Sequence, residues 1–148
     1  MTTLLPNTTM GDGAAVPHRV WIVEDEPQAS DLALDLCAAG GADGRVFRDP
    51  VEFINALRGE LAPSAVVLDW RLERELSAAL FMATRHHYPG LPVIYWTGTP
   101  TGSLPSMIHN DPDTQVVDKA DGLVAFEAAL AWALTMADEA RSASEPAS

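Results

Sequence analysis

Residues 65–70, with the sequence AVVLDW, decide the fold of this chain. Apolar residues run directly into Asp69, and the polar segment RLERE follows at residues 71–75. A short, continuous apolar run of this kind is typical of a strand that is buried on both faces, as in parallel sheets covered by helices. Asp69 would then end a central strand, at the edge where open α/β sheets bind their ligands.

The same alternation of apolar runs and helical patterns continues on both sides of Asp69. Further strands are predicted at residues 20–23, 45–47, 92–96 and 115–118, and helices at residues 27–39, 50–57, 74–87 and 121–140. Three prolines between residues 100 and 112 exclude a long helix there, so we expect mostly loop, with a turn or two near residues 106–109. The pattern predicts an α/β fold: a doubly wound, five-stranded parallel sheet of the flavodoxin-like kind, with the fourth helix short or missing.

Composition restricts the function classes. The 148 residues fit one domain, and we expect a domain at 18–140 between disordered tails at 1–17 and 141–148. The formal net charge of −12 argues against binding to nucleic acid or to an anionic membrane surface. No apolar run has transmembrane length, no signal-peptide pattern is present, and Cys37 is the single cysteine, so we expect a cytoplasmic protein without disulfides.

Polar side chains follow several of the predicted strands. Glu24 and Asp25 follow the first, Asp69 the third, Thr97 the fourth and Lys119 the fifth. Carboxylates that cluster at one sheet edge repel one another unless a cation lies among them, and Mg²⁺ prefers oxygen ligands of this type. A carboxylate is also able to accept a phosphoryl group as a nucleophile. Taken singly, each of these residues also has an ordinary explanation, as a helix N-terminus, a helix cap or a surface lysine.

Four motifs carry a resemblance to a known family. They are IVEDEP at residues 22–27, VLDW at 67–70, VIYWT at 93–97 and VVDK at 116–119. In this order and spacing they make residues 19–140 resemble the receiver domain of two-component response regulators. The resemblance implies that Asp69 accepts phosphate from a phosphohistidine of a histidine kinase or histidine phosphotransferase.

The resemblance also implies a magnesium site and a readout. Asp25 and Asp69 would bind Mg²⁺ together with the backbone carbonyl of Arg71, and Glu24 would contribute through water. Thr97 and Lys119 would sense the phosphorylated state.

Three residues depart from the family pattern. Ala120 replaces the proline that usually follows the lysine, so the Lys119–Ala120 bond is either trans or a strained cis bond. Val116 stands where an aromatic switch residue is usual, and Gly98 stands where alanine or serine usually follows the threonine. The sequence keeps the residues of the phosphoryl chemistry and alters those of the readout.

The leading hypothesis is a stand-alone receiver, a phosphoacceptor rather than an enzyme, that signals to a downstream protein through protein contacts. One alternative is an adaptor of the same fold that works without phosphorylation, which Val116 and Ala120 favour. Another is a flavodoxin-like flavin carrier, because residues 96–101 (WTGTPT) are similar to a phosphate-binding loop.

The terminal helix offers a possible contact surface. Its spacing predicts one stripe facing the sheet, formed by Leu123, Phe126, Leu130 and Leu134. Trp132 lies on the opposite side of the helical wheel, beside Val124. We therefore expect an exposed Trp132 that contacts a partner or a second copy in a homodimer.

Overall fold

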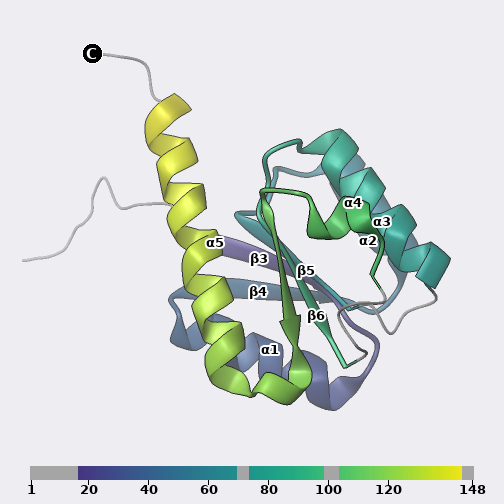
Figure 1. Cartoon of the computed structure of the whole chain (residues 1–148). Helices are drawn as coiled ribbons and strands as arrows, with labels where there is room; N and C mark the ends of the chain where they lie inside the picture. The colour runs from purple at the N-terminus through teal and green to yellow at the C-terminus, as the bar shows by residue number, and fades with distance from the viewer. Residues whose placement is uncertain (1–16, 70–73, 99–103, 145–148) are drawn as a thin grey trace, which may run out of the picture.

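The computed structural model describes residues 17–69, 74–98 and 104–144, in which strands and helices alternate along the chain (Figure 1). The elements are β3 (His18–Val23), α1 (Pro27–Ala39), β4 (Ala42–Phe47), α2 (Pro50–Gly59), β5 (Ala65–Leu68), α3 (Arg74–His87), β6 (Val93–Thr97), α4 (Ser106–His109), β7 (Thr114–Asp118), η2 (Lys119–Asp121) and α5 (Leu123–Ser144).

The five strands form one parallel sheet in the order β4-β3-β5-β6-β7. This confirms the predicted doubly wound α/β fold. The strand order reverses between β3 and β5, and a crevice at the carboxyl ends of the strands is expected at such a switch point. Strand β5 contains the AVVL run of the sequence, and all four of its residues are buried.

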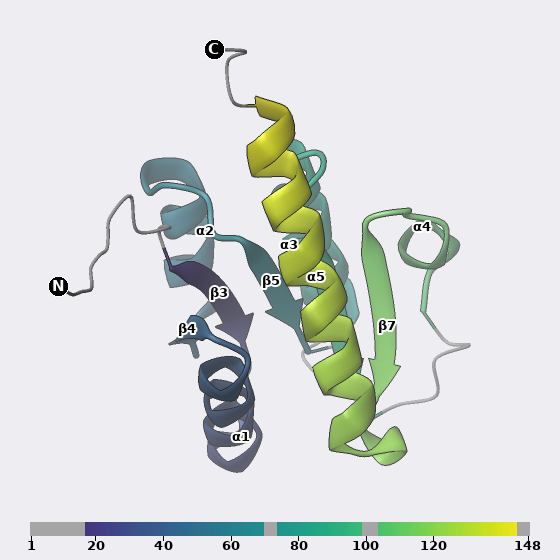
Figure 2. The ribbon, with the colours of Figure 1, turned by 90° about the vertical axis from the view of Figure 1, so that its left-hand side faces the viewer.

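Helices cover both faces of the sheet because the strand side chains alternate between two cores. Val20 and Ile22 of β3 belong to a core that α1 and α5 cover, on the side that faces the viewer in Figure 2. Trp21 and Val23 belong to a second core that α2, α3 and α4 cover. Both faces of β3 are thus buried, as its continuous apolar sequence predicts.

Local signals in the sequence account for several helix ends. Pro27 and Pro50 lie in the first turns of α1 and α2, where proline costs no hydrogen bond. The Asp49 side chain caps α2 by accepting a hydrogen bond from the backbone N–H of Val51 at 2.9 Å. Gly41 has φ of 84°, which lets the chain turn sharply from α1 into β4.

Strand β4 and helix α5 extend furthest beyond their predicted bounds, and α4 is as short as expected. Strand β4 begins at Ala42 rather than Arg45, because pairing with β3 along six residues outweighs the weak strand propensity of Asp43 and Gly44. Helix α5 continues to Ser144 rather than Ala140, in a segment rich in alanine. Helix α4 has four residues, in agreement with the prediction from the prolines around it. None of the helices in the described ranges has the length and apolar character needed to cross a membrane.

The prediction of which α5 side chains face the core is partly wrong. Phe126, Leu130 and Leu134 do face the core, whereas Leu123, at the first residue of the helix, is 45% exposed. Trp132 is not exposed: it is half-buried and packs against the core beneath α1 and α5. The small residues Ala129 and Ala133 lie between helix and sheet, so the large indole beside them reaches the same core. Trp132 therefore does not form the exposed contact surface for a homodimer that the sequence predicted.

Candidate functional site

Three candidate residues follow directly after strands at the carboxyl edge of the sheet. Glu24 follows β3, Asp69 follows β5 and Lys119 follows β7. Backbone hydrogen bonds continue past the strand ends: the Asp69 N–H donates to the carbonyl of Val23 at 3.3 Å, and the Glu24 N–H donates to that of Phe47 at 3.2 Å. Hydrogen bonds of the sheet therefore fix the backbone positions of Glu24 and Asp69.

The carboxylates of Glu24, Asp25 and Asp69 form a compact cluster. One oxygen of each lies within 4.8 Å of the other two. Glu24 is 1% exposed and Asp69 is 2% exposed, whereas Asp25 is exposed to solvent. Two carboxylates of the cluster are thus buried, and the third is exposed to solvent.

Lys119 brings a positive charge to the two buried carboxylates. Its Nζ lies 3.1 Å from Oε1 of Glu24 and 3.7 Å from Oδ2 of Asp69. The other oxygen of Glu24, Oε2, accepts a hydrogen bond from the backbone N–H of Glu26 at 3.3 Å. The resemblance implied that Glu24 helps to bind Mg²⁺ through water; in the structure Glu24 also contacts Lys119 directly.

Burial raises the pKa of Glu24 from its ordinary value of 4.5 to about 7. Loss of hydration is the largest cause, and the hydrogen bond and negative charge of Asp69 add to it. Lys119 acts in the opposite direction and compensates only in part. Burial thus favours the neutral form of the Glu24 carboxyl despite the nearby ammonium.

The donor set fits a hard divalent cation. Three carboxylates carry a formal charge of −3 when ionised, and Lys119 reduces it to −2. Carboxylate oxygens are the ligands that Mg²⁺ selects, with water or phosphate oxygens completing its shell. Glu24, Asp25 and Asp69 are thus the described residues able to hold such an ion, and the predicted fourth ligand, the Arg71 carbonyl, lies outside the described residues.

Thr97 shares the sheet edge with this cluster. It is the last residue of β6, the neighbour of β5 in the sheet, and it is fully buried. Its strand partner in β7 is Asp118, the residue before Lys119. The five side chains proposed from the sequence as Glu24, Asp25, Asp69, Thr97 and Lys119 therefore all belong to the carboxyl ends of the strands.

Sequence reasoning missed several buried residues that contact the cluster or its neighbours. Ser77 of α3 donates a hydrogen bond from Oγ to the backbone carbonyl of Asp69 at 3.4 Å. The Tyr95 hydroxyl donates to the Ser77 carbonyl at 2.9 Å, and burial raises the pKa of Tyr95 above its usual range. Trp96, directly before Thr97, lies with its ring centre 4.9 Å from Lys119 Nζ. No spacing rule in the sequence links these residues to Asp69.

Two of the three positions that depart from the family pattern, Val116 and Ala120, have ordinary local structure. Val116 is half-buried and packs against the core beneath α2, α3 and α4. No cis peptide bond occurs in the described ranges, so the Lys119–Ala120 bond is trans. The Asp118 side chain accepts a hydrogen bond from the Ala120 N–H at 2.8 Å and begins η2. Asp118 is thus a cap for the turn after Lys119.

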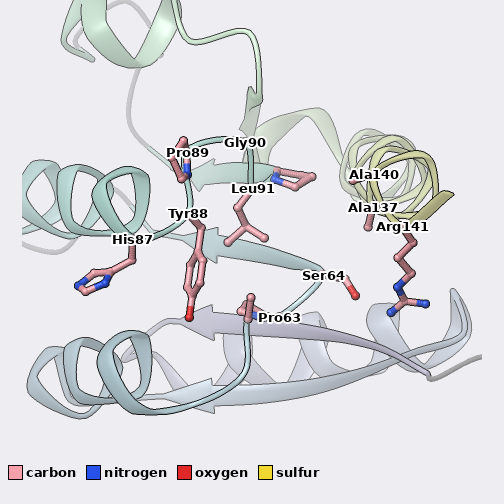
Figure 3. A pocket seen from close by; sticks show the side chains of 12 residues that line it. Pro63, Ser64, His87, Tyr88, Pro89, Gly90, Leu91, Ala137, Ala140 and Arg141 are labelled. Carbon is pink, nitrogen blue, oxygen red and sulfur yellow. The ribbon is translucent and has the colours of Figure 1, made fainter. Parts of the chain in front are cut away.

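A cavity of about 500 Å³ lies at the other end of the sheet (Figure 3). Its lining comes from the segments before β5 and β6 and from the last turns of α5, and includes Pro63, Ser64, Tyr88, Leu91 and Ala137. None of the clustered acidic residues or Lys119 lines it. The acid cluster and this cavity are therefore separate features at opposite ends of the strands.

Comparison with known proteins identifies the fold. No protein-family model matches the sequence, and no curated protein matches it. Among solved structures, the chain is similar to a CheY-like response regulator receiver domain protein from Methanospirillum hungatei JF-1, with a TM-score of 0.72 and 16% identity over 84% of this chain and 98% of that one.

Two further structures agree. A signal receiver domain of an HD domain-containing protein from Pseudomonas fluorescens Pf-5 matches with a TM-score of 0.73 and 18% identity over 87% of this chain and 96% of that one. NtrX from Brucella abortus matches with a TM-score of 0.72 and 23% identity over 87% of this chain and 29% of that one. At these identities the likeness shows a shared fold.

Proposed function

We propose that this chain, which has the fold of a response-regulator receiver, accepts a phosphoryl group on Asp69 in two-component signalling. The main support for this proposal is the position of Asp69. The buried Asp69 carboxylate lies within 4.8 Å of those of Glu24 and Asp25, and 3.7 Å from the Lys119 ammonium. A nucleophilic carboxylate, an acidic site for a divalent cation and a fixed positive charge are what transfer of a phosphoryl group requires.

In the proposed reaction, an oxygen of Asp69 attacks the phosphorus of a phosphohistidine on a histidine kinase or histidine phosphotransferase. An O–P bond forms while the P–N bond of the donor breaks, and the electron pair remains on the imidazole nitrogen. The protein contributes mainly position and charge, because little covalent chemistry is needed at the phosphorus. Lys119 neutralises charge on the phosphoryl oxygens, and the Thr97 hydroxyl donates a hydrogen bond to one of them.

Glu24, Asp25 and Asp69 would hold Mg²⁺ in this state, with the Arg71 carbonyl as a further ligand. A bound Mg²⁺ offsets the negative charge of the carboxylates and of the incoming phosphate. The geometry of the cluster supports this assignment, because one oxygen of each of the three carboxylates lies within 4.8 Å of the other two. The modified protein would then signal to a downstream protein through surface contacts.

Incubation with acetyl phosphate and Mg²⁺, followed by intact-mass measurement, tests the proposal. Wild type should gain one phosphoryl group, and Asp69→Asn should gain none. Asp31→Asn is the matched control, because Asp31 is an exposed aspartate on α1. An unchanged wild-type mass, or equal modification of wild type and Asp69→Asn, would refute Asp69 as the acceptor.

An adaptor that works without phosphorylation is the second candidate. Val116, in place of an aromatic side chain, favours it, since a half-buried valine has no large ring to move between two positions. The same mass measurement separates the two functions. A wild-type protein that binds Mg²⁺ yet never gains a phosphoryl group would support the adaptor.

A further inference from the structure

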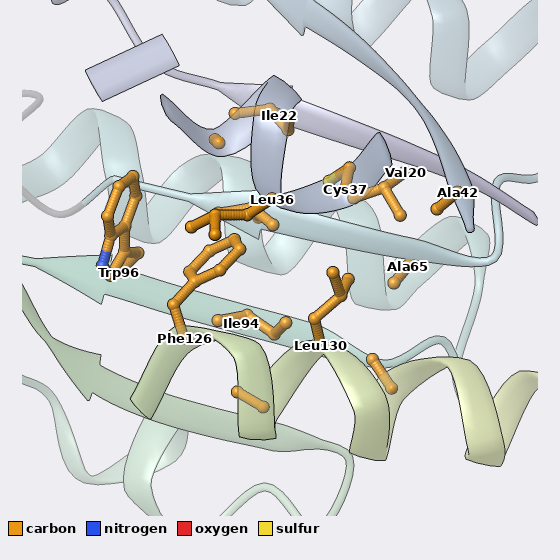
Figure 4. Close-up of a cluster of buried hydrophobic side chains, with 14 of the residues drawn as sticks. Val20, Ile22, Leu36, Cys37, Ala42, Ala65, Ile94, Trp96, Phe126 and Leu130 are labelled. Atoms are coloured by element: carbon orange, nitrogen blue, oxygen red, sulfur yellow. The ribbon is translucent and has the colours of Figure 1, made fainter. Parts of the chain in front are cut away.

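Trp96 lies between the acid cluster and the terminal helix. Its ring centre is 4.9 Å from Nζ of Lys119 on one side and 4.8 Å from the ring centre of Phe126 of α5 on the other. The side chain is 4% exposed and belongs to the core beneath α1 and α5, where Figure 4 shows it beside Phe126. One indole therefore contacts both the cation of the site and the helix that covers the sheet.

Filling apolar space does not by itself require an indole at this position. The Nε1–H of Trp96 is buried and has no hydrogen-bond acceptor among the described residues. A buried donor without an acceptor lowers stability, and phenylalanine or leucine would fill apolar space without carrying such a donor. The feature that tryptophan has and leucine lacks is the negative face of a large π system.

The cation beside this π face is the Lys119 ammonium, which lies near two buried carboxylates. The Lys119 ammonium touches Glu24 at 3.1 Å but stays 3.7 Å from Asp69. Both carboxylates are buried, so Lys119 has two competing anions nearby and an aromatic face as its third neighbour. Attraction between an ammonium and an indole is strongest where water is excluded, and Trp96 is buried.

We propose that Trp96 is a positioning residue, which holds the Lys119 ammonium beside Asp69 through a cation–π contact. This inference rests on the proposed phosphoryl transfer to Asp69. The indole restricts where the long, flexible lysine side chain lies, so the ammonium is already in place when charge develops on the phosphoryl oxygens. Trp96 itself touches neither the phosphoryl group nor Asp69 in this mechanism.

The first test compares the rate of phosphorylation by acetyl phosphate in wild type, Trp96→Phe and Trp96→Leu. Phenylalanine keeps a weaker π face and leucine has none, so the rate should fall in the order Trp, Phe, Leu, with about a tenfold loss for leucine. Trp132→Phe and Trp132→Leu are matched controls, because Trp132 packs against the same core from α5. Their rates should equal that of wild type.

The second test needs no phosphorylation. Lys119 is the only lysine of the chain, so lysine labelled with ¹³C gives side-chain NMR signals from one residue. The indole ring should shift the Lys119 side-chain protons upfield in wild type, less in Trp96→Phe and not at all in Trp96→Leu. Both Trp132 variants should keep the wild-type signals.

The two tests separate the possible failures. If wild type gains no phosphoryl group, the proposed function fails, and the NMR signals alone decide whether Trp96 places Lys119. If wild type is phosphorylated and Trp96→Leu reacts within twofold of it, the positioning role is overturned while the proposed function stands. Lys119 signals that are identical in wild type and Trp96→Leu overturn the contact itself. Rates that follow the melting temperatures of all five proteins, rather than the aromatic series, also overturn the positioning role.

Discussion

The carboxylate of Glu24 lies 3.1 Å from the ammonium of Lys119, although 95 residues separate them along the chain. The contact joins the carboxyl ends of β3 and β7, the first and last strands in the part of the chain that the structure describes. Asp69 lies 3.7 Å from the same ammonium. One cation therefore compensates two buried anions, and the stability and the chemistry of the edge depend on it.

Removal of this cation should destabilise the fold. In Lys119→Met, buried Glu24 loses the ammonium 3.1 Å away and buried Asp69 loses the one 3.7 Å away, and we expect the free energy of unfolding at pH 8 to fall by about 3–5 kcal/mol. Arg45→Met is the control, because Arg45 and Glu60 form an exposed salt bridge, worth about 0–1 kcal/mol. Urea unfolding without Mg²⁺ measures both; equal losses for the two variants would contradict the prediction.

Glu24 should make the stability of the metal-free protein depend on pH. Its folded pKa of about 7 lies above its ordinary value of 4.5, so between these values the folded state binds more protons than the unfolded state. The free energy of unfolding should therefore fall as pH rises from about 4.5 to about 7, by up to about 3 kcal/mol.

Glu24→Gln should remove this contribution, since glutamine does not titrate. Urea unfolding at several pH values measures the slope, and Glu52→Gln is the control at an exposed glutamate of α2. A slope in Glu24→Gln equal to that of wild type would assign the pH dependence to other groups.

Mg²⁺ should stabilise the folded protein through Asp25. Binding only to the folded state adds about 2.7 kcal/mol at a concentration of 100 times Kd. Asp25→Asn removes the exposed carboxylate of the cluster, so the rise in melting temperature with Mg²⁺ should be smaller than in wild type. Asp35→Asn, at an exposed aspartate of α1, should respond like wild type. An equal rise in Asp25→Asn would exclude Asp25 as a ligand.

Arg85 should be required to hold the loops around α4 and β6. Its guanidinium donates to the carbonyls of Tyr88, Pro89 and Leu91 and pairs with Asp111, with Nε 2.8 Å from Oδ2. Lysine has no planar fork with which to repeat these bonds, so Arg85→Lys should lose about 1–3 kcal/mol of stability.

Arg58→Lys on exposed α2 is the control, since such surface changes stay within about 0.5 kcal/mol. Thermal and urea unfolding measure both variants. A stability of Arg85→Lys equal to that of wild type would show that the guanidinium bonds are replaceable.

The sequence predicted the sheet well because buried parallel strands have continuous apolar sequences. The AVVL run before Asp69 and the apolar run at residues 20–23 needed no tertiary information. Strand β4 was underestimated, because Asp43 and Gly44 pair with β3 despite their weak propensity. Trp132 was misplaced, because a helical wheel gives direction but not how close a helix of small residues packs.

Sequence patterns could not predict which side chains contact one another at the site. Residues at strand ends could be assigned to one edge, but the closer approach of Lys119 to Glu24, at 3.1 Å, than to Asp69, at 3.7 Å, depends on register and rotamers. The position of Trp96 against Lys119 depends on which face of β6 the indole occupies. Arg71 and the ends of the chain lie outside the described residues, and the predictions that concern them stay predictions.

The two outer strands of the sheet bear on how this protein associates with others. Strand β4 carries exposed Asp43 and Arg45, and β7 has Pro112 shortly before it and Asp118 at its end. Charged side chains and proline at such margins oppose the docking of a strand from another molecule. Growth of the sheet into fibres or intermolecular ribbons is therefore disfavoured.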